Sequence, residues 1–331
     1  MFFVECSGDP HEVGVQHGEM LKEEIRRAYA EWEAEKWLAD DLAPCRTRVQ
    51  EYLREHYPEM LQEIEGIAEG AGVDVDVPFA LTGFNSIQPA LTECSVFAVR
   101  GEDRRGCVGK THDIGVVEQR WGLVQKIRYA NGMNMIRAGS VGSLWTVAGI
   151  NERGMAVATA SGPRFTGQDG YGVPQHAGPT PVLYRCKTVG AAIHEFRKMT
   201  FAGKGLNMAL ADAQGDVAAI EKSFDKQAVR YPKKGPAFAT NHYTGAEMKG
   251  HMKVDAQNSK ERFKRLKEVL APGVFADPVA KLKEVIADPS EPGAICREGK
   301  TLTTFVCDPG KGHLWACPGT PTVESWVCFR L

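Results

Sequence analysis

The hydrophobic pattern of the first 90 residues is helical. Apolar residues in "EMLKEEIRRAYAEW" recur at steps of three and four, the period of an amphipathic helix. The inward positions of this helix are Leu21, Ile25, Ala28 and Trp32. A second helix is predicted through "VQEYLREHYPEMLQEIEGIAEGAG", and it ends at Gly70 and Gly72 because glycine is a common helix terminator. Its inward positions are Leu53, Met60, Ile64 and Ile67.

From Cys94 onward the pattern changes to short strands separated by turns. "SVFAVR" and "CVGKTHD" flank the turn "GEDRRG", and "LVQKIRYANGMNMIRAG" predicts a hairpin around Asn131-Gly132, a dipeptide that suits a two-residue turn. "LWTVAGINERGMAVATAS" predicts a second hairpin that turns at residues 151–154. Further strands are expected in "LNMALADAQGDVAAIEKS", in "PAFATNHY" and in a closing meander over 301–331. Helices are expected near 182–199, in "SKERFKRLKEVLA" and in "PVAKLKEVIA".

Blocks of strands that alternate with pairs of helices are typical of an α+β fold, in which helices cover sheets. The 331 residues are enough to bury a substantial core. No repeat or low-complexity linker divides the chain, so the pattern gives no reason to cut it into independently folding domains.

Composition and charge exclude several classes of protein. The chain is 43% hydrophobic and 25% charged, as ordinary globular proteins are. A net charge of -2 gives no reason to expect nucleic acid or an anionic membrane surface as a partner. No apolar run approaches the ~20 residues of a membrane-spanning helix, and "MFFVECSGDPHEVG" lacks the basic flank of a secretory signal. We therefore expect a cytoplasmic protein.

The nine cysteines are spread along the chain and are expected to be reduced. Four of them look periodic near the end of the chain, and zinc binding is one interpretation: Cys296, Cys307, Cys317 and Cys328. None of the four forms a CxxC pair, which structural zinc sites usually contain. Cysteines on neighbouring strands of a meander explain the spacing equally well, so we expect no metal.

Cys94 is the strongest candidate for chemistry, because it opens a strand after a loop. A buried structural cysteine is the alternative. Asp113 lies one hairpin later, Asn241 ends an apolar strand in "FATNHY", and Arg297 precedes the closing meander. A thiol, a carboxylate, an amide and a guanidinium together suit acyl transfer: the thiolate attacks a carbonyl, an amide stabilises the oxyanion, and the charged pair orients the nucleophile.

The general base of such a reaction has two possible sources. His112 or His242 could serve, as a histidine does in papain-like enzymes, although neither lies in the flanking pattern of those families. Alternatively, cleavage before Cys94 would expose an α-amino group that acts as the base of an N-terminal nucleophile. The pKa values of a free α-amine and a thiol are close enough for proton exchange near neutral pH.

Several motifs resemble, in their order, those of the acyl-coenzyme A:6-aminopenicillanic acid acyltransferase family, peptidase family C45 of the N-terminal nucleophile (Ntn) hydrolases. They are "GDPHEVGVQHGEML", "EIEGIAEGAGV", "CSVFAV", "VAGINERGMAVA", "ATNH", "SKERFKRLKEVL" and "AICR". The resemblance covers most of the chain. It implies a four-layer αββα Ntn-hydrolase sandwich of the α+β class, and it implies no cofactor.

The resemblance also implies roles for single residues. Cys94 matches the nucleophile that self-cleavage makes N-terminal, and Asp113 matches the acidic residue that contacts its amine. Asn241 matches the oxyanion-hole amide and Arg297 the arginine that supports the site. Lys110 falls where the related bile-salt hydrolases keep a basic residue, which makes it a candidate for substrate binding.

Cleavage at Glu93–Cys94 would divide the chain into a helical segment, 1–93, and a catalytic part, 94–331. The chain departs from the family at Glu93, where a glycine is usual, and a carboxylate beside the thiol is expected to slow self-cleavage. It also departs in "KTHDIG", where His112 is expected to shape a different substrate pocket; His242 is the further candidate for substrate binding.

The predicted activity is therefore that of an amidohydrolase or acyltransferase acting on a small N-acylated amine through a thioester on Cys94. One alternative is an uncleaved, non-catalytic relative that binds a small ligand. Another is a metallohydrolase that uses His112, Asp113 and His242, although no motif such as HExxH is present. The expected partner is a small-molecule amide or acyl donor, and the sequence leaves open whether copies of the chain form a homo-oligomer.

Overall fold

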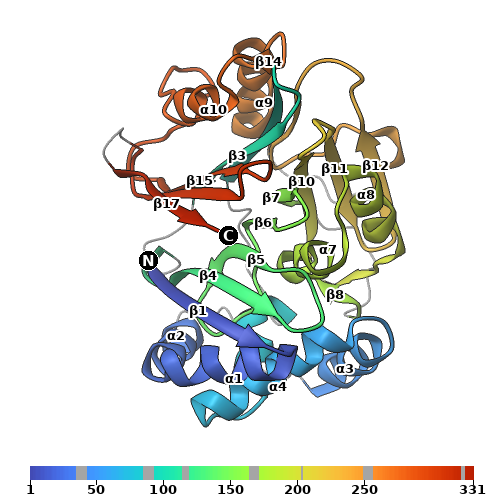
Figure 1. Cartoon of the computed structure of the whole chain (residues 1–331), viewed down its shortest axis with the longest axis vertical. Helices are drawn as coiled ribbons and strands as arrows, with labels where there is room; N and C mark the ends of the chain where they lie inside the picture. Colours follow the sequence, from blue (N-terminus) through green and yellow to red (C-terminus); the bar gives the residue numbers. More distant parts are fainter. Residues whose placement is uncertain are drawn as a thin grey trace.

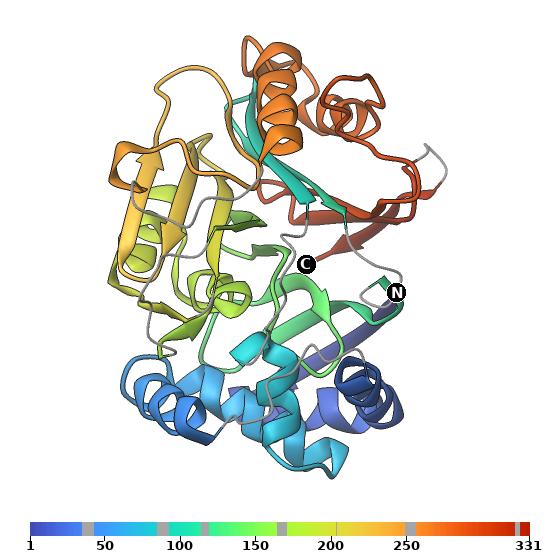
Figure 2. The same cartoon turned by 180° about the vertical axis from the view of Figure 1, so that it is seen from behind.

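The described part of the chain is built from two β-sheets that face each other and helices that cover their outer faces (Figures 1 and 2). The computed structural model describes residues 1–34, 43–84, 93–113, 119–163, 171–202, 204–248, 256–321 and 325–331, with side chains of the second range described from 47 to 83. No helix in these ranges is long and apolar enough to cross a membrane.

The first sheet contains eight strands in the order β1-β4-β5-β6-β7-β10-β11-β12. They are β1 (Phe2–Gly8), β4 (Gly122–Tyr129), β5 (Met135–Ser140), β6 (Ala148–Asn151), β7 (Met155–Gly162), β10 (Gly205–Asp212), β11 (Val217–Ser223) and β12 (Lys226–Arg230). Only the pair β1–β4 of this sheet is parallel within the described residues.

The second sheet has the order β13-β2-β3-β15-β16-β17, and β14 also pairs with β2. Its strands are β13 (Ala237–Ala239), β2 (Glu93–Gly101), β3 (Gly106–Asp113), β15 (Thr301–Asp308), β16 (His313–Pro318), β17 (Val327–Arg330) and β14 (Val274–Phe275). Two short strands, β8 (Val173–Pro174) and β9 (Phe201–Ala202), pair separately.

The helices fall into two groups. Those on the first sheet are α1 (Pro10–Met20), α2 (Lys22–Ala34), α3 (Ala43–His56), α4 (Pro58–Ala71), α5 (Asp76–Phe79), α7 (Pro179–Arg185) and α8 (Val189–Lys198). The second sheet is covered by α9 (Gln257–Val269) and α10 (Pro278–Ile286).

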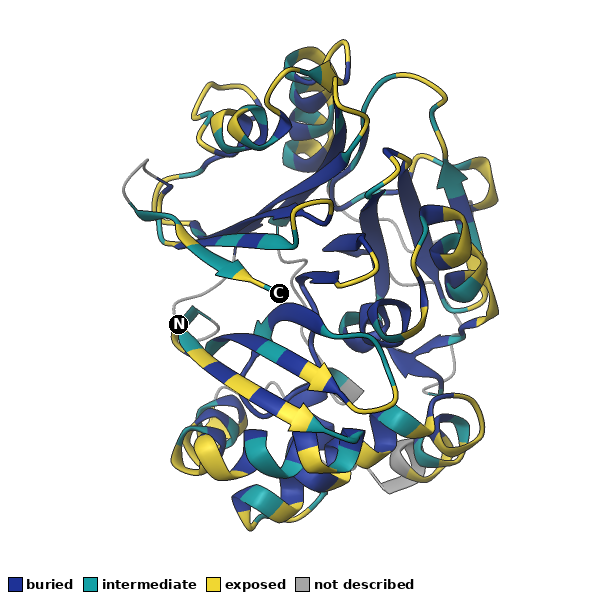
Figure 3. Ribbon diagram, viewed as in Figure 1, coloured by how far each residue is buried: buried dark blue, intermediate teal, exposed yellow. Residues whose placement is uncertain are grey.

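Three clusters of buried hydrophobic side chains lie between the four layers of the fold. Figure 3 shows the buried residues in dark blue. One joins the first helical group to the first sheet, for example through Ile64 and Ile220. The second lies between the sheets and includes Val96 and Ile136. The third joins α9 and α10 to the second sheet, where Leu266 is buried. The layers run helix, sheet, sheet, helix, so the predicted αββα fold is confirmed.

The first 90 residues are not wholly helical, and this prediction was wrong in two places. Residues 2–8 form β1, in which Val4 and Cys6 are buried while Phe3 is exposed, so the pattern alternates with the period of a strand. The second predicted helix is two helices, because Pro58 begins α4 and cannot continue α3. The eight predicted inward side chains are all buried, and Gly72 caps α4 in the left-handed conformation.

Both predicted hairpins form, but the first has a wider loop than predicted. Its last paired residues are Ile127 and Met135, so Asn131-Gly132 is not a two-residue turn. Beyond Ile127, β4 continues to Tyr129 because it pairs there with β1, its neighbour on the other side, through Gly8. The hairpin between β6 and β7 turns where predicted, at residues 151–154, and the Asn151 side chain accepts from the N–H of Met155. β12 was not predicted from the sequence.

Candidate functional site

The strand pair β2–β3 brings the predicted nucleophile and its carboxylate together. Cys94 lies opposite His112 in the register, and Glu93 lies opposite Asp113. The Cys94 side chain is 1% exposed and belongs to the cluster between the sheets. Lys110 lies on the same face of β3 as His112, because side chains two apart on a strand point the same way. A thiol, an ammonium and an imidazole therefore meet at one end of the space between the sheets.

Lys110 is a buried cation beside the thiol. Its ammonium donates to the carbonyl of Thr159 in β7 and is in hydrogen-bonding contact with the Cys94 side chain. Burial lowers the pKa of Lys110, while Cys94 and Asp113 act in the opposite direction. A cation in this place can stabilise negative charge that develops on the sulfur. Lys110, which falls where the related bile-salt hydrolases keep a basic residue, thus contacts the predicted nucleophile.

Asn241 follows β13, and both the oxygen and the nitrogen of its side-chain amide form hydrogen bonds. Its Oδ1 accepts from the main-chain N–H of Cys94 at 2.8 Å and from Nη2 of Arg262 at 2.9 Å. Its Nδ2 donates to the carbonyl oxygen of Ser161 at 2.9 Å. Two donors at Oδ1 fix which end of the amide faces Cys94. The oxygen, rather than the Nδ2 group, faces the Cys94 main chain, and the oxyanion role of Asn241 stays a prediction.

Arg262 is a site residue that the sequence reasoning missed. It is 0% exposed, and its Nη1 donates to the Cys94 carbonyl oxygen and, at 2.9 Å, to Oγ of Ser95. The guanidinium therefore joins the strand that carries Cys94 to the turn that carries Asn241. A signal was present in the sequence: Arg262 shares the buried face of α9 with Ser259 and Leu266, at helical spacing, and arginine is rarely buried without a partner.

Asp113, at the end of β3, and Arg297, shortly before β15, lie close together, and their predicted role in orienting the nucleophile stays a prediction. Thr301 Oγ1 donates to Asp113 Oδ1 at 2.6 Å, and Arg297 Nη1 lies 3.4 Å from Asp113 Oδ2. Arg297 also forms an ion pair with Glu93. Burial raises the pKa of Asp113, and the bond from Thr301 and the charges of Arg262 and Lys110 act against that rise. Arg297 thus contacts two carboxylates, while Arg262 contacts the main chain of Cys94.

The two candidate histidines lie in different surroundings. Burial holds the pKa of His112 well below its usual range, with Lys110 adding to the effect. Burial also lowers the pKa of His242 to about 4. Both imidazoles are therefore neutral near neutral pH. His112 lies on the strand next to Cys94, whereas Nδ1 of His242 lies 2.8 Å from Oγ of Ser259 on α9. Their roles as base or substrate ligand stay predictions.

In the described part of the chain, no group of three or more histidine, cysteine, aspartate or glutamate side chains is arranged to hold a metal ion. Neither the four cysteines near the C-terminus nor the set of His112, Asp113 and His242 forms such a group. Cys307 lies in β15, Cys317 in the neighbouring β16 and Cys328 in β17, as expected for cysteines of a meander, whereas Cys296 lies before the first of these strands.

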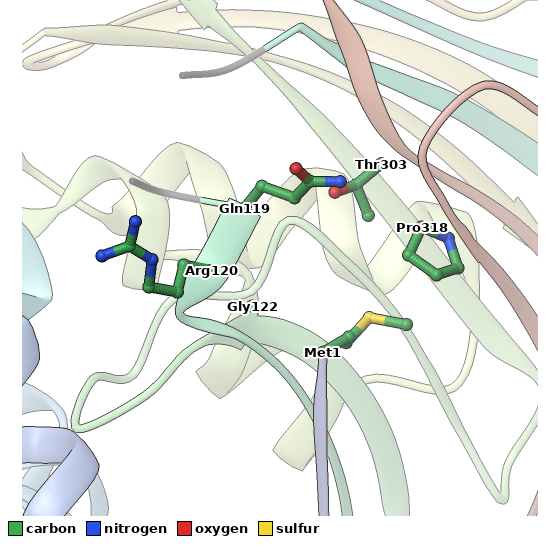
Figure 4. A pocket seen from close by; sticks show the side chains of 6 residues that line it. All are labelled: Met1, Gln119, Arg120, Gly122, Thr303 and Pro318. Atoms are coloured by element: carbon green, nitrogen blue, oxygen red, sulfur yellow. The ribbon is translucent and has the colours of Figure 1, made fainter. Parts of the chain in front are cut away.

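A pocket of about 210 Å³ lies beside this end of the strand pair (Figure 4). Thr303 of β15, on one of its walls, stands opposite His112 in the register. Residues at or near strand ends of both sheets line the pocket: Met1, Gln119, Arg120, Gly122, Thr303 and Pro318. One strand, β3, therefore lies between the pocket residue Thr303 and the strand of the predicted nucleophile.

Together, the fold and the site define an αββα protein with a cysteine held by its main chain at the start of a central strand. The model of the family "Acyl-coenzyme A:6-aminopenicillanic acid acyl-transferase" matches residues 100–322, well over half of the chain. The chain therefore belongs to this family, as its motifs predicted. The match begins after Cys94 and includes the positions of Lys110, Asp113, Asn241 and Arg297.

Three similar solved structures are an N-acylethanolamine-hydrolyzing acid amidase ortholog from Caenorhabditis elegans, penicillin V acylase from Agrobacterium tumefaciens and a variant of conjugated bile acid hydrolase from Clostridium perfringens. Their sequences are 13%, 16% and 12% identical to this chain, and the TM-scores are 0.49, 0.45 and 0.45. Each comparison covers 72% of this chain, and 100%, 86% and 92% of the other chain, respectively. A search of the curated proteins found no match.

Proposed function

We propose that the chain is a cysteine Ntn hydrolase that cuts its own Glu93–Cys94 bond and then acts on the amide bond of a small N-acylated amine. The observation that carries this proposal is the double hold on the Cys94 main chain: Asn241 binds its N–H and Arg262 binds its carbonyl. An N-terminal nucleophile requires such a hold, because breaking the preceding bond turns residue 94 into a free chain end, and its α-amine and thiol must then keep their position in the site.

Self-cleavage and turnover use the same sulfur. In self-cleavage the Cys94 thiolate attacks the Glu93 carbonyl carbon, the C–N bond breaks, the new α-amine takes a proton, and water hydrolyses the thioester. In turnover the α-amine takes the thiol proton, and the sulfur attacks the substrate carbonyl. The substrate amine leaves with that proton, and an acyl-thioester remains. Water completes a hydrolysis, and a second amine completes a transfer.

The neighbouring groups have distinct parts in this scheme. Lys110 stabilises charge on the sulfur, because it contacts the Cys94 side chain. Asp113 orients the new α-amine from the opposite strand. His112, neutral and next to the pocket of Figure 4, shapes the space that the substrate enters. Residues 1–93 remain attached after cleavage as a small subunit, because β1 and α1–α4 are packed into the first sheet and its core.

The test is the intact mass of the purified protein under denaturing conditions. We expect two fragments that together equal the chain plus one water, with the break between Glu93 and Cys94. Cys94→Ala should stay uncut. Cys107→Ala is the matched control, because Cys107 is equally buried at the far end of β3 and should leave cleavage unchanged. The mature protein should then release amine from N-acyl anilides.

One uncut chain, stable over days, would contradict the proposal. The ion pair between Glu93 and Arg297 favours the intact chain, so this outcome would support the alternative of an uncleaved relative that binds a small ligand. Under that alternative, Cys94→Ala would leave ligand affinity nearly unchanged. Under the proposal, it abolishes turnover.

A further inference from the structure

Two carboxylates face each other at the start of β2, and an arginine lies between them. Glu93 is opposite Asp113 in the antiparallel register, where like charges repel. Arg297 forms an ion pair with Glu93 and lies 3.4 Å from Asp113. The arginine side chain is 13% exposed and that of Glu93 is 36% exposed, so the pair is only partly open to water. Arg297 is therefore the residue that allows a carboxylate to stand directly before the predicted nucleophile.

The position of Arg297 does not depend on Glu93. Its own N–H donates to Oγ1 of Thr301 at 2.8 Å, and its carbonyl accepts from the N–H of Thr301, also at 2.8 Å. Thr301 opens β15 and pairs with Asp113, so the turn that carries Arg297 is tied to the central sheet. If Glu93 leaves after cleavage, the guanidinium stays and loses its closest anion. Asp113 remains as the more distant anion: its Oδ2 lies 3.4 Å from Arg297, and its Oδ1 accepts from Thr301, which holds the carboxylate on its own strand.

The chemistry of self-cleavage shows which acyl group fits this arrangement. The thioester formed on Cys94 during self-cleavage carries Glu93 as its acyl group. From the acyl carbon, that group runs through Cα, Cβ and Cγ to a carboxylate, and this carboxylate binds Arg297 in the uncut chain. A substrate acyl group is attached to the same sulfur, so a carboxylate at the same distance along that group can take the place of the Glu93 carboxylate at Arg297.

We propose that Arg297 selects substrates whose acyl group ends in a carboxylate at the reach of a glutamate side chain, that is, N-glutaryl or α-glutamyl amides. This inference rests on the proposed function. The Cys94 sulfur attacks the glutaryl carbonyl, the C–N bond breaks, the amine leaves with the thiol proton, and water releases glutarate from the thioester. Arg297 exchanges no proton in these steps. It binds the distal carboxylate by charge-assisted hydrogen bonds.

The experiment compares two substrates on the mature, self-cleaved protein. One is the N-glutaryl amide of 7-amino-4-methylcoumarin, and the other replaces the distal carboxylate by a primary amide of the same shape. We expect kcat/KM for the charged substrate to be at least about tenfold higher. Arg297→Gln should bring the ratio close to one, and Arg297→Lys should keep a preference for the charged substrate. Arg105→Gln is the control, because Arg105 pairs with Asp308 at the far end of the β2–β3 hairpin and should leave the ratio unchanged.

The outcomes separate this inference from the proposed function. Equal turnover of both substrates by the wild type would overturn the inference and leave the proposed function intact. An unchanged ratio in Arg297→Gln would also overturn the inference. An uncut chain that turns over neither substrate would overturn the proposed function, and the inference with it. If Arg297→Gln fails to mature, the wild type still decides: glutarate should inhibit turnover of the neutral substrate, and its uncharged diamide should not. Equal inhibition by the two compounds would overturn the inference.

Discussion

Replacing Lys222 with methionine should stabilise the protein near neutral pH. Lys222 lies in β11 with its side chain 0% exposed, and its Nζ has no hydrogen-bond partner among the described residues. The ammonium lies 5.2 Å from the ring centroid of Phe201, and the charge of Asp225 acts against the effect of burial. An ammonium that has left water without gaining a hydrogen bond costs free energy. Methionine would keep the apolar stem and remove that charge.

The magnitude follows from the pKa. Burial lowers the pKa of Lys222 from 10.5 to about 8. At about 1.36 kcal/mol per pKa unit, the charged side chain destabilises the fold by roughly 3 kcal/mol below pH 8. Loss of the cation–π contact offsets about 0.5–1 kcal/mol, so Lys222→Met should gain about 2 kcal/mol near pH 7.

The sign of the pH dependence follows from the same shift. The folded pKa lies below the unfolded one, so the unfolded chain holds more protons between about pH 8 and 10.5. Wild-type stability due to this group therefore rises with pH across that window. The gain from the substitution should accordingly shrink, and by about pH 9.5 roughly half of the charge penalty should be gone.

The assay is guanidinium chloride unfolding at both pH values in a Cys94→Ala background, which keeps the chain in one piece. Lys226→Met is the control, because Lys226 is exposed on the neighbouring β12 and should change little. A Lys222→Met protein that is less stable than its background near pH 7, or a gain that grows with pH, would refute the reasoning.

Three further substitutions test the site and the core. Arg262→Gln should slow both self-cleavage and turnover by about 10²-fold, measured by intact mass and kcat, because it loosens Cys94; an unchanged rate of both would contradict its positioning role. Glu63→Gln should lower the free energy of unfolding by about 3–5 kcal/mol, because it leaves the buried Arg137 without its ion-pair partner; a loss below about 1 kcal/mol would count against the pair. Gly14→Ala should cost about 1–3 kcal/mol in thermal unfolding, because its Cβ would come within 2.2 Å of the carbonyl oxygen of Glu63 in α4. Gly190→Ala, with nothing within 4 Å, is the control for Gly14→Ala and should not destabilise.

The sequence predicted secondary-structure elements correctly where one hydrophobic periodicity extends over the whole element. The inward face of α2 was predicted from its apolar spacing, and Ile25 and Trp32 are buried as expected. The hairpin of β2 and β3 was predicted from its turn, and it brings Cys94 and Asp113 to one sheet end. These predictions depend on neighbours within about ten residues. The same reasoning missed β1, because seven residues are a weak signal and their strand partner lies more than 100 residues away.

Contacts between distant segments could not be predicted in the same way. The glycines of α1 and α4 show this, because Gly14, Gly18, Gly66 and Gly70 allow the two helix backbones to touch, yet in the sequence they look like breaks in a helix. Gly70 was accordingly expected to end α4, but the helix continues to Ala71. A glycine serves as a terminator or as a contact surface depending on which element lies against it.

By itself, the sequence determined the fold class, the family and the candidate nucleophile. Amphipathic periodicity, turn residues and the order of motifs are local features of the sequence. They can be recognised without knowing which distant segments pack against them. The tertiary structure alone decided what holds the nucleophile: Asn241 and Arg262 lie 147 and 168 residues from Cys94. It also decided that Arg297 faces Glu93. A buried guanidinium is stable only where carbonyl, amide or carboxylate oxygens surround it, and only the packing of four layers brings those oxygens to one place.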